Sequence, residues 1–136
     1  TNIQTLDSRG FETEINFPFV WNTKSQNLQL GYTYLTDDLR EVAVNFSRYS
    51  INSLKHHFTA SYRSTITSKL QGFLGLKYAQ RPQVEGYTVV DANVIWNFKS
   101  FQFQAAVYNL FNQEYSETNL VPMPGRNARF SLIYQF

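Results

Sequence analysis

Histidine ligation of a metal is the first chemistry to test, because His56 and His57 are adjacent and are the only histidines of the chain. Neighbouring residues of a strand point to opposite faces, so the pair is not expected to share an ion. The absence of cysteine excludes thiolate metal sites, disulfides and a cysteine nucleophile. No serine nucleophile motif is present, and the dispersed Asp and Glu form no convincing carboxylate pair. We therefore expect no catalytic residue, no metal site and no cofactor.

Composition narrows the class of protein further. The 136 residues suit one ordinary domain, and a net charge of +2 gives no electrostatic reason to expect nucleic acid. Charged residues make up 16%, against about 25% in an average soluble domain. Aromatic residues reach 17%, and Asn, Gln, Ser and Thr replace many of the usual Lys and Glu. No apolar run approaches the roughly 18 residues of a membrane helix.

Alternation of apolar and polar side chains, with exceptions such as Ile133, predicts strands throughout the chain. The predicted strands are residues 10–20, 27–35, 54–63, 69–80, 88–98, 101–108 and 130–136. We expect the second strand to break at Asp37 and Asp38, after which Val42, Val44 and Phe46 could continue it. The segment 109–115 is the only candidate for a helical turn. The expected fold is therefore all-β and antiparallel, with about seven strands.

The apolar faces of these strands contain no Lys, Arg, Asp or Glu away from the strand ends. An Arg or Lys at the middle of a bilayer costs about 2–4 kcal/mol, so contact with lipid would remove charges in this way. The connections also alternate in length. Residues 22–26, 64–68 and 99–100 form short turns, whereas 36–53, 81–87 and 109–127 are longer. Short turns on one side and long loops on the other indicate a transmembrane β-barrel.

Aromatic residues collect at the edge of the predicted sheet that carries the short turns. Trp21, Trp96, Phe98 and Phe101 lie there, as an interfacial aromatic girdle would. The terminal strand places Phe130, Leu132, Tyr134 and Phe136 on one face and stops on an aromatic residue. A soluble barrel or sandwich shows the same alternation with its apolar face turned inward. The polar-face composition, the clustered aromatics and the alternating connections favour the membrane barrel.

Two separated motifs carry a resemblance to a known family. Residues 109–115 read Asn-Leu-Phe-Asn-Gln-Glu-Tyr, and Pro124-Gly125-Arg126 precede the terminal strand. This arrangement resembles the carboxy-terminal end of a TonB-dependent outer-membrane receptor, with Asn112 in place of the usual Asp. Arg9-Gly10-Phe11-Glu12 and Tyr87-Thr88-Val89-Val90-Asp91 resemble strand openings of the same family. The resemblance extends over essentially all 136 residues.

The resemblance implies a barrel of 22 antiparallel strands around an amino-terminal plug. Residues 1–136 would supply about the last seven strands, with the plug absent. The complete receptor would import a ferric siderophore, haem or cobalamin across the bacterial outer membrane with energy from TonB. Implied partners are outer-membrane lipid, the missing plug and barrel strands, TonB through the plug, and the barrel assembly machinery. That machinery would read the alternating terminal strand formed by Phe130, Leu132, Tyr134 and Phe136.

Two sets of residues follow as candidates for binding. Side chains on the polar faces would hydrogen-bond the plug: Glu12, Glu14, Asn16, Gln29, Arg63, Asp91, Asn93, Gln102, Gln104 and Arg129. Loop side chains would touch the nutrient: Arg81, Gln83, Tyr87, Tyr115, Asn119 and Met123. Gly125 and Arg126 are expected to form a turn or strand entry instead, because Gly tolerates a positive φ.

Other functions stay open at this point. A small self-contained outer-membrane barrel could have a structural or adhesion role, and a lipocalin-like barrel could bind a ligand in its apolar interior. An enzyme is the weakest class, since no residue set supports it. Residues 1–10 have neither the basic start nor the apolar stretch of a secretion signal. An outer-membrane protein needs such a signal, so we expect that it was removed or that the chain belongs to a longer protein.

Overall fold

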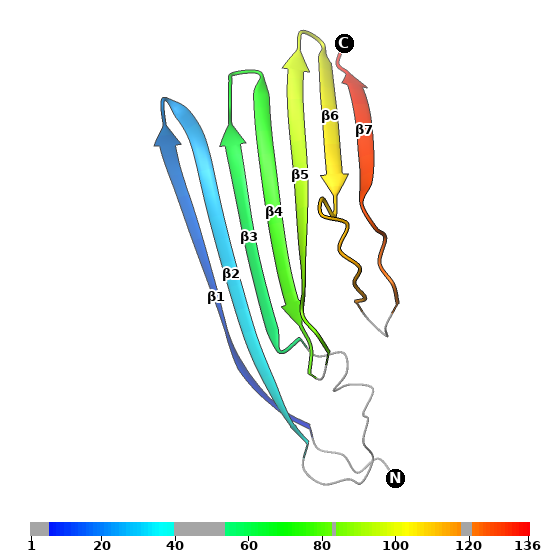
Figure 1. Ribbon diagram of the computed structural model, residues 1–136. Coiled ribbons are helices and arrows are strands. Elements are labelled where there is room, and N and C mark those ends of the chain that lie inside the picture. The colour runs from blue at the N-terminus through cyan, green and yellow to red at the C-terminus, as the bar shows by residue number, and fades with distance from the viewer. Residues whose placement is uncertain (1–5, 40–53, 83, 118–120) are drawn as a thin grey trace.

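The computed structural model describes residues 6–39, 54–82, 84–117 and 121–136, and these form one antiparallel sheet. Its strands are β1 (Leu6–Trp21), β2 (Lys24–Leu39), β3 (His56–Thr65), β4 (Leu70–Gln80), β5 (Tyr87–Phe98), β6 (Phe101–Tyr108) and β7 (Asn127–Tyr134). Each strand pairs with its neighbour in sequence, so β1 and β7 are the edges of the sheet (Figure 1). The predicted all-β, antiparallel fold is confirmed.

The register of the sheet follows the side-chain alternation. One row across the strands joins Phe17, Leu28, Tyr62, Leu74, Ala92, Val107 and Ala128. The next row joins Pro18, Asn27, Arg63, Phe73, Asn93, Ala106 and Arg129. A slip of one residue would exchange the two faces of a strand, so the alternation fixes the pairing. The sheet therefore has one largely apolar face and one largely polar face.

The strand boundaries correct two predictions. The expected break at Asp37 and Asp38 is wrong, because β2 continues through both residues and pairs with β1 as far as Leu6. Val42, Val44 and Phe46 lie outside the described residues. The first short connection contains only Asn22 and Thr23, rather than residues 22–26. Both have positive φ, 47° and 62°, which is the backbone that a two-residue hairpin turn requires.

The three short connections lie together at one edge, the upper end of the sheet in Figure 1, and we call it the turn edge. They contain residues 22–23, 66–69 and 99–100. The opposite end, where the longer connections begin, is the loop edge. β1 and β2 extend farther toward the loop edge than β3, because the β2–β3 pairing stops at Tyr34 and His56.

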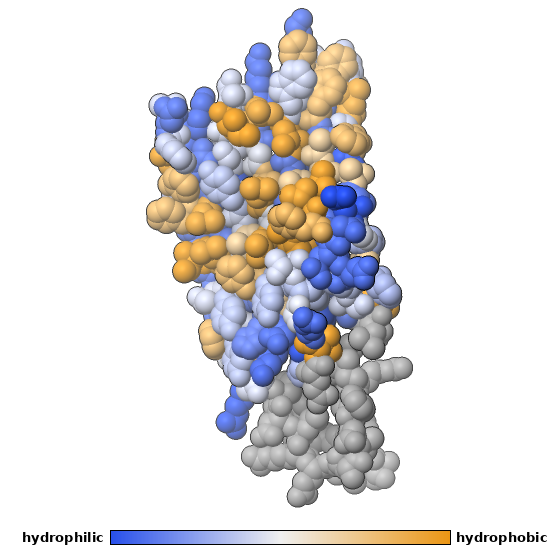
Figure 2. Space-filling model, viewed as in Figure 1, coloured by the Kyte–Doolittle hydropathy of each residue, from blue (hydrophilic) through white to orange (hydrophobic). Residues whose placement is uncertain are grey.

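The sheet lacks the two-layered core of a soluble β protein among its described residues. Phe17 is 59% exposed, Leu74 50% and Phe130 79%, all on the apolar face. Figure 2 shows hydrophobic side chains spread over the middle and upper right of the visible surface. A face of this kind needs a partner, which lipid provides for a membrane barrel. No helix of the described residues is long and apolar enough to cross a membrane.

Candidate functional site

The candidate plug-binding residues share one face of the sheet. In the register, Glu12, Glu14 and Asn16 lie on the same face as Gln29 and Arg63. The same face carries the remaining candidates: Asp91, Asn93, Gln102, Gln104 and Arg129. Neighbours on it already interact, as Gln29 donates a hydrogen bond to Glu14 and Gln102 donates one of 2.8 Å to Asn97. The structure therefore places all ten on one face of the sheet.

The segment after β6 docks onto the sheet through Asn109, which is only 2% exposed. Its backbone N–H donates to Asp91 Oδ1 at 2.8 Å, and Leu110 N–H donates to Val90 O at 2.7 Å. The Asn109 side chain accepts from Gln113 N–H and donates to the carbonyl of Gln113, each at 2.8 Å. A φ of 52° at Asn109 turns the chain there. Asp91 thus binds the docked segment, a role that its place on the polar face did not reveal.

The two motifs that carried the family resemblance also contact each other. Asn112, with φ of 55°, accepts a hydrogen bond from Arg126 N–H at 2.8 Å, and Arg126 Nη1 donates to Leu110 O at 3.4 Å. The reason given for Gly125 is wrong, since no glycine of the described residues has a positive φ. A Cβ on Gly125 would instead lie 2.8 Å from Asn112 Oδ1, so glycine leaves room for that side chain. The expected helical turn is a single tight turn closed by Asn112 N–H on Asn109 O at 2.9 Å.

A charged and aromatic cluster holds the far end of this segment. Lys77 of β4 forms an ion pair and hydrogen bond with Glu117. Its Nζ lies 5.5 Å from the ring centre of Tyr115 and 5.8 Å from that of Tyr87, and the two rings are 4.6 Å apart. Tyr87 forms a small buried core with Ala79 and Val89, and Tyr115 packs against it. The segment is therefore fixed to the polar face at both ends.

Glu117 and Tyr115 titrate away from their ordinary values for reasons visible in this cluster. The hydrogen bond from Lys77 lowers the pKa of Glu117 below its ordinary value of 4.5. Burial raises the pKa of Tyr115 above 10.0, although the charge of Lys77 opposes the shift. Glu117 is therefore ionised at pH 7, as its ion pair with Lys77 requires. Tyr115 is neutral at this pH.

Two hollows flank the docked segment. One of about 520 Å³ lies on the polar face and is lined by Lys77, Asp91, Asn109 and Tyr115, among others. The other, of about 480 Å³, lies at the loop edge between residues 81 and 84–88 on one side and 113–117 on the other. Arg81 lines the second hollow, and its Nε is buried without a hydrogen-bond partner among the described residues.

The loop candidates are only partly brought together. Arg81, Tyr87 and Tyr115 line the second hollow. Tyr87 was wrongly assigned to a loop, because it opens β5 and is only 8% exposed. Met123 lines neither hollow, and its N–H donates to Tyr115 O at 2.9 Å. Gln83 and Asn119 lie outside the described residues.

Sequence reasoning missed Lys77 and Glu117 as functional candidates. Lys77 stood out only as a cation in the middle of the polar face of its strand, and Glu117 only as an acid in a loop. Forty positions separate them, so no local spacing links the pair. The histidines lie on opposite faces as expected: His56 hydrogen-bonds the Tyr32 hydroxyl at 2.8 Å, and His57 pairs with Thr33 of the polar face.

The predicted girdle residues all lie on the apolar face near the turn edge. Trp96 packs on Phe103 at 5.3 Å between ring centres and on Phe98 at 5.5 Å, and Phe101 contacts Tyr134 at 5.0 Å. Trp21 is at the end of β1. The residues of the expected assembly signal, Phe130, Leu132, Tyr134 and Phe136, are 79%, 61%, 54% and 110% exposed. This end of the sheet therefore presents its rings outward.

An antiparallel sheet with an outward apolar face, a polar opposite face and alternating connection lengths defines the wall of a transmembrane β-barrel. The sequence profile described as "TonB dependent receptor-like, beta-barrel" matches residues 1–110. The chain therefore belongs to the TonB-dependent receptor β-barrel family, and it lies in the bacterial outer membrane. Membership makes it part of a receptor rather than an enzyme.

Relatives in two strains of Vibrio cholerae serotype O1 agree with this assignment. Each is an iron-regulated outer membrane virulence protein, 30% identical to this chain over 127 residues. The matched region covers 83% of this chain but 19% of each relative, so the chain spans about a fifth of their length. No solved structure matches the chain. The family assignment replaces the alternatives of a self-contained barrel and a lipocalin-like module.

Proposed function

We propose that residues 1–136 form about the last seven strands of a 22-strand receptor barrel that imports an iron complex with energy from TonB. The coarse function, nutrient transport across the outer membrane, follows the family. The iron-regulated relatives favour a ferric siderophore or haem over cobalamin as the nutrient. The plug and the remaining strands would belong to other parts of the receptor, and TonB would act through the plug. The barrel assembly machinery would insert the receptor by reading β7.

The polar face would serve as the docking surface for the plug. Its donors and acceptors run from Glu12 and Glu14 on β1 to Arg129 on β7. Acidic side chains lie on β1 (Glu12, Glu14) and on β5 (Asp91), whereas Arg63 and Arg129 place cations on β3 and β7. A polar face lining a lumen needs hydrogen-bonding partners, which plug side chains or water supply. The apolar face would meet outer-membrane lipid.

The second hollow carries the proposal of nutrient contact. Arg81, Tyr87 and Tyr115 line it, and the buried Arg81 Nε is a donor without a partner among the described residues. Iron complexes that bear carboxylate or phenolate groups offer the acceptor that a guanidinium recognises. Because the docked segment fixes Tyr115 beside Tyr87, the hollow is formed before a ligand arrives.

Uptake measurements would test this function. The full-length receptor that contains this chain would be expressed in cells without other iron receptors, and uptake of radiolabelled ferric siderophore and haem would be followed. We expect saturable uptake of one of them that disappears when TonB is deleted. Uptake that persists without TonB, or uptake of cobalamin alone, would contradict the proposal.

A pair of variants would locate the nutrient contact. Arg81→Ala should weaken the apparent affinity about tenfold, since a hydrogen bond to a charged group contributes about 1.5–3 kcal/mol. Arg9→Ala removes a cation from β1 away from the hollow and serves as the matched control. Equal losses in both variants would show a general charge effect rather than a contact at the hollow.

A further inference from the structure

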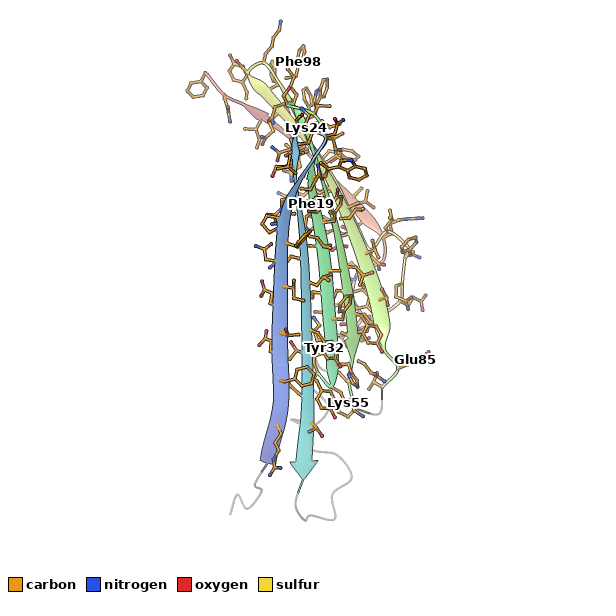
Figure 3. The ribbon with its side chains drawn as sticks, turned by 90° about the vertical axis from the view of Figure 1, so that its left-hand side faces the viewer. Phe19, Lys24, Tyr32, Lys55, Glu85 and Phe98 are labelled. Carbon is orange, nitrogen blue, oxygen red and sulfur yellow. The ribbon has the colours of Figure 1, made fainter. Side chains whose placement is uncertain are left out.

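Acidic side chains are absent from the half of the sheet that leads to the turn edge. Residues 15–30, 57–76 and 92–113 contain no Asp or Glu, although the chain has ten of them. Cations are present in each of these ranges, as Lys24, Lys69 and Lys99. In Figure 3 the labelled Lys24 and Phe98 lie near the turn edge, whereas Lys55 and Glu85 lie toward the loop edge. Charge is therefore distributed unevenly along the strands. The charged side chains at the turn edge are all positive, and the acidic side chains of the described residues lie toward the loop edge.

Each of these lysines lies in a short connection or directly beside it. Lys24 follows the Asn22–Thr23 turn, Lys69 ends the turn before β4, and Lys99 begins the turn between β5 and β6. Lys69 and Lys99 are exposed, and Lys24 is half-buried. None of the three forms an ion pair within the described residues. Lys24 and Lys69 enter strands that are two apart, about 10 Å, whereas Lys69 and Lys99 flank the paired strands β4 and β5.

The lysines lie next to the aromatic residues of the apolar face. Lys24 pairs in register with Trp21, and Lys99 Nζ lies 5.6 Å from the ring centre of Phe98. Lys69 O accepts a hydrogen bond of 2.8 Å from the N–H of Asn97, the residue between Trp96 and Phe98. Trp belongs at the level of lipid headgroups, and lysine reaches from an apolar surface toward phosphate. Cation and ring therefore meet at the depth where a headgroup would lie.

We propose that the turn edge binds anionic phospholipids of the inner leaflet of the outer membrane, with Lys24, Lys69 and Lys99 each contacting a headgroup phosphate. Short turns face the periplasm in outer-membrane barrels, so the inner leaflet is the one within reach. The aromatic rings pack against the upper acyl chains, and the lack of acidic side chains removes repulsion of the phosphate. Each lysine near an anionic surface contributes about fivefold to the preference. The turn edge therefore selects lipids with a negatively charged headgroup, in addition to packing against their acyl chains.

Lipid co-purification would test the proposal on the full-length receptor. The receptor is reconstituted with phosphatidylethanolamine and a minority of phosphatidylglycerol, and the bound lipids are counted by native mass spectrometry. We expect enrichment of phosphatidylglycerol over its bulk fraction. In the triple variant Lys24→Gln, Lys69→Gln, Lys99→Gln, the enrichment of phosphatidylglycerol should fall at least about tenfold. Unchanged enrichment in the triple variant would overturn the proposal.

A charge-matched control separates this edge from the charge of the whole receptor. The variant Arg9→Gln, Lys55→Gln, Arg81→Gln removes three cations away from the turn edge and should keep the enrichment. Equal loss in both triple variants would contradict a site at the turn edge. Millimolar inorganic phosphate should not displace the lipid, and displacement would show a general anion site instead. If the triple variant does not fold, Lys24→Gln and Lys99→Gln are measured singly, and each must reduce the enrichment severalfold.

Discussion

The turn edge and the loop edge of this sheet are built on different principles. At the turn edge, hairpins of a few residues close through local geometry, as the positive φ at Asn22, Thr23 and Lys99 shows. At the loop edge, Asn109 and Asn112 have the same backbone conformation but are held by contacts to residues far away in sequence. The same left-handed asparagine thus makes a simple turn in one place and anchors a folded segment in the other. Tertiary contact, rather than turn chemistry, distinguishes the edge that is proposed to meet the nutrient.

The largest effect should come from disturbing the apolar band that separates the two edges. Leu74→Arg places a charge on the exposed apolar face and should destabilise the inserted barrel by about 2–4 kcal/mol. Gln29→Arg lies at nearly the same depth on the polar face and can pair with Glu14, so it should be almost neutral. Urea unfolding of the full-length receptor in vesicles measures both. Similar losses would show that the apolar face does not contact lipid.

The next largest effect should distinguish the two kinds of asparagine. Asn109→Ala removes the side chain that bonds Gln113 and Pro124 and leaves buried backbone groups unpaired. A loss of about 2–3 kcal/mol is expected, since an unsatisfied buried group costs about 1–3 kcal/mol and alanine disfavours positive φ. Asn22→Ala at the exposed hairpin should cost about 1 kcal/mol through its backbone alone. Comparable losses from unfolding curves would contradict the proposed difference between the edges.

Gly125→Ala should have a smaller effect that depends on Asn112. The added Cβ would meet Asn112 Oδ1 at 2.8 Å, so the side chain must move and its bond to Arg126 N–H weakens. We expect a loss of about 1 kcal/mol, the net contribution of one hydrogen bond. In the Asn112→Ala background the same change should cost almost nothing. Additive effects of the two substitutions in unfolding experiments would show that the clash is not the cause.

The smallest effect concerns pH at the loop edge. Because the pKa of folded Glu117 is depressed, its contribution is complete above the unfolded value near 4.5 and is lost as pH falls through the lower folded value. Release of the docked segment should therefore increase in acid, measured as limited proteolysis within residues 113–117. Glu117→Gln should open the segment at pH 7 and remove this dependence, whereas Glu85→Gln serves as the control. An unchanged acid response in Glu117→Gln would assign it to another group.

Most of the sheet was predictable from sequence because its alternation has period two and every strand pairs with its neighbour. The seven strands, the short connections and the two faces depend on information within a few residues. The continuation of β2 through Asp37 and Asp38 was missed because charge was taken to end a strand. That assumption holds within a bilayer, but these residues lie beyond the part of β2 that pairs with β3.

The docked segment was not predictable from local pattern. The motifs at residues 109–115 and 124–126 were recognised, but their contact joins residues fourteen positions apart. The Lys77–Glu117 pair joins residues forty positions apart, and neither residue has a spacing that marks it. Tyr87 was placed in a loop as the last residue of the connection 81–87, although its ring is buried in the cluster that opens β5. Contacts of this kind can be predicted only when the register of the sheet is already known.

The extra length of β1 and β2 carries part of both strands beyond the hydrocarbon layer of the membrane. Each has 16 residues, whereas about 9–11 tilted residues cross the hydrocarbon layer. At about 3.3 Å per residue, five surplus residues carry the hairpin roughly 17 Å beyond the oily layer. Among the described residues, this paired ribbon extends farthest toward the loop edge (Figure 1). An antibody or an adsorbing phage that contacts the ribbon would therefore meet paired backbone.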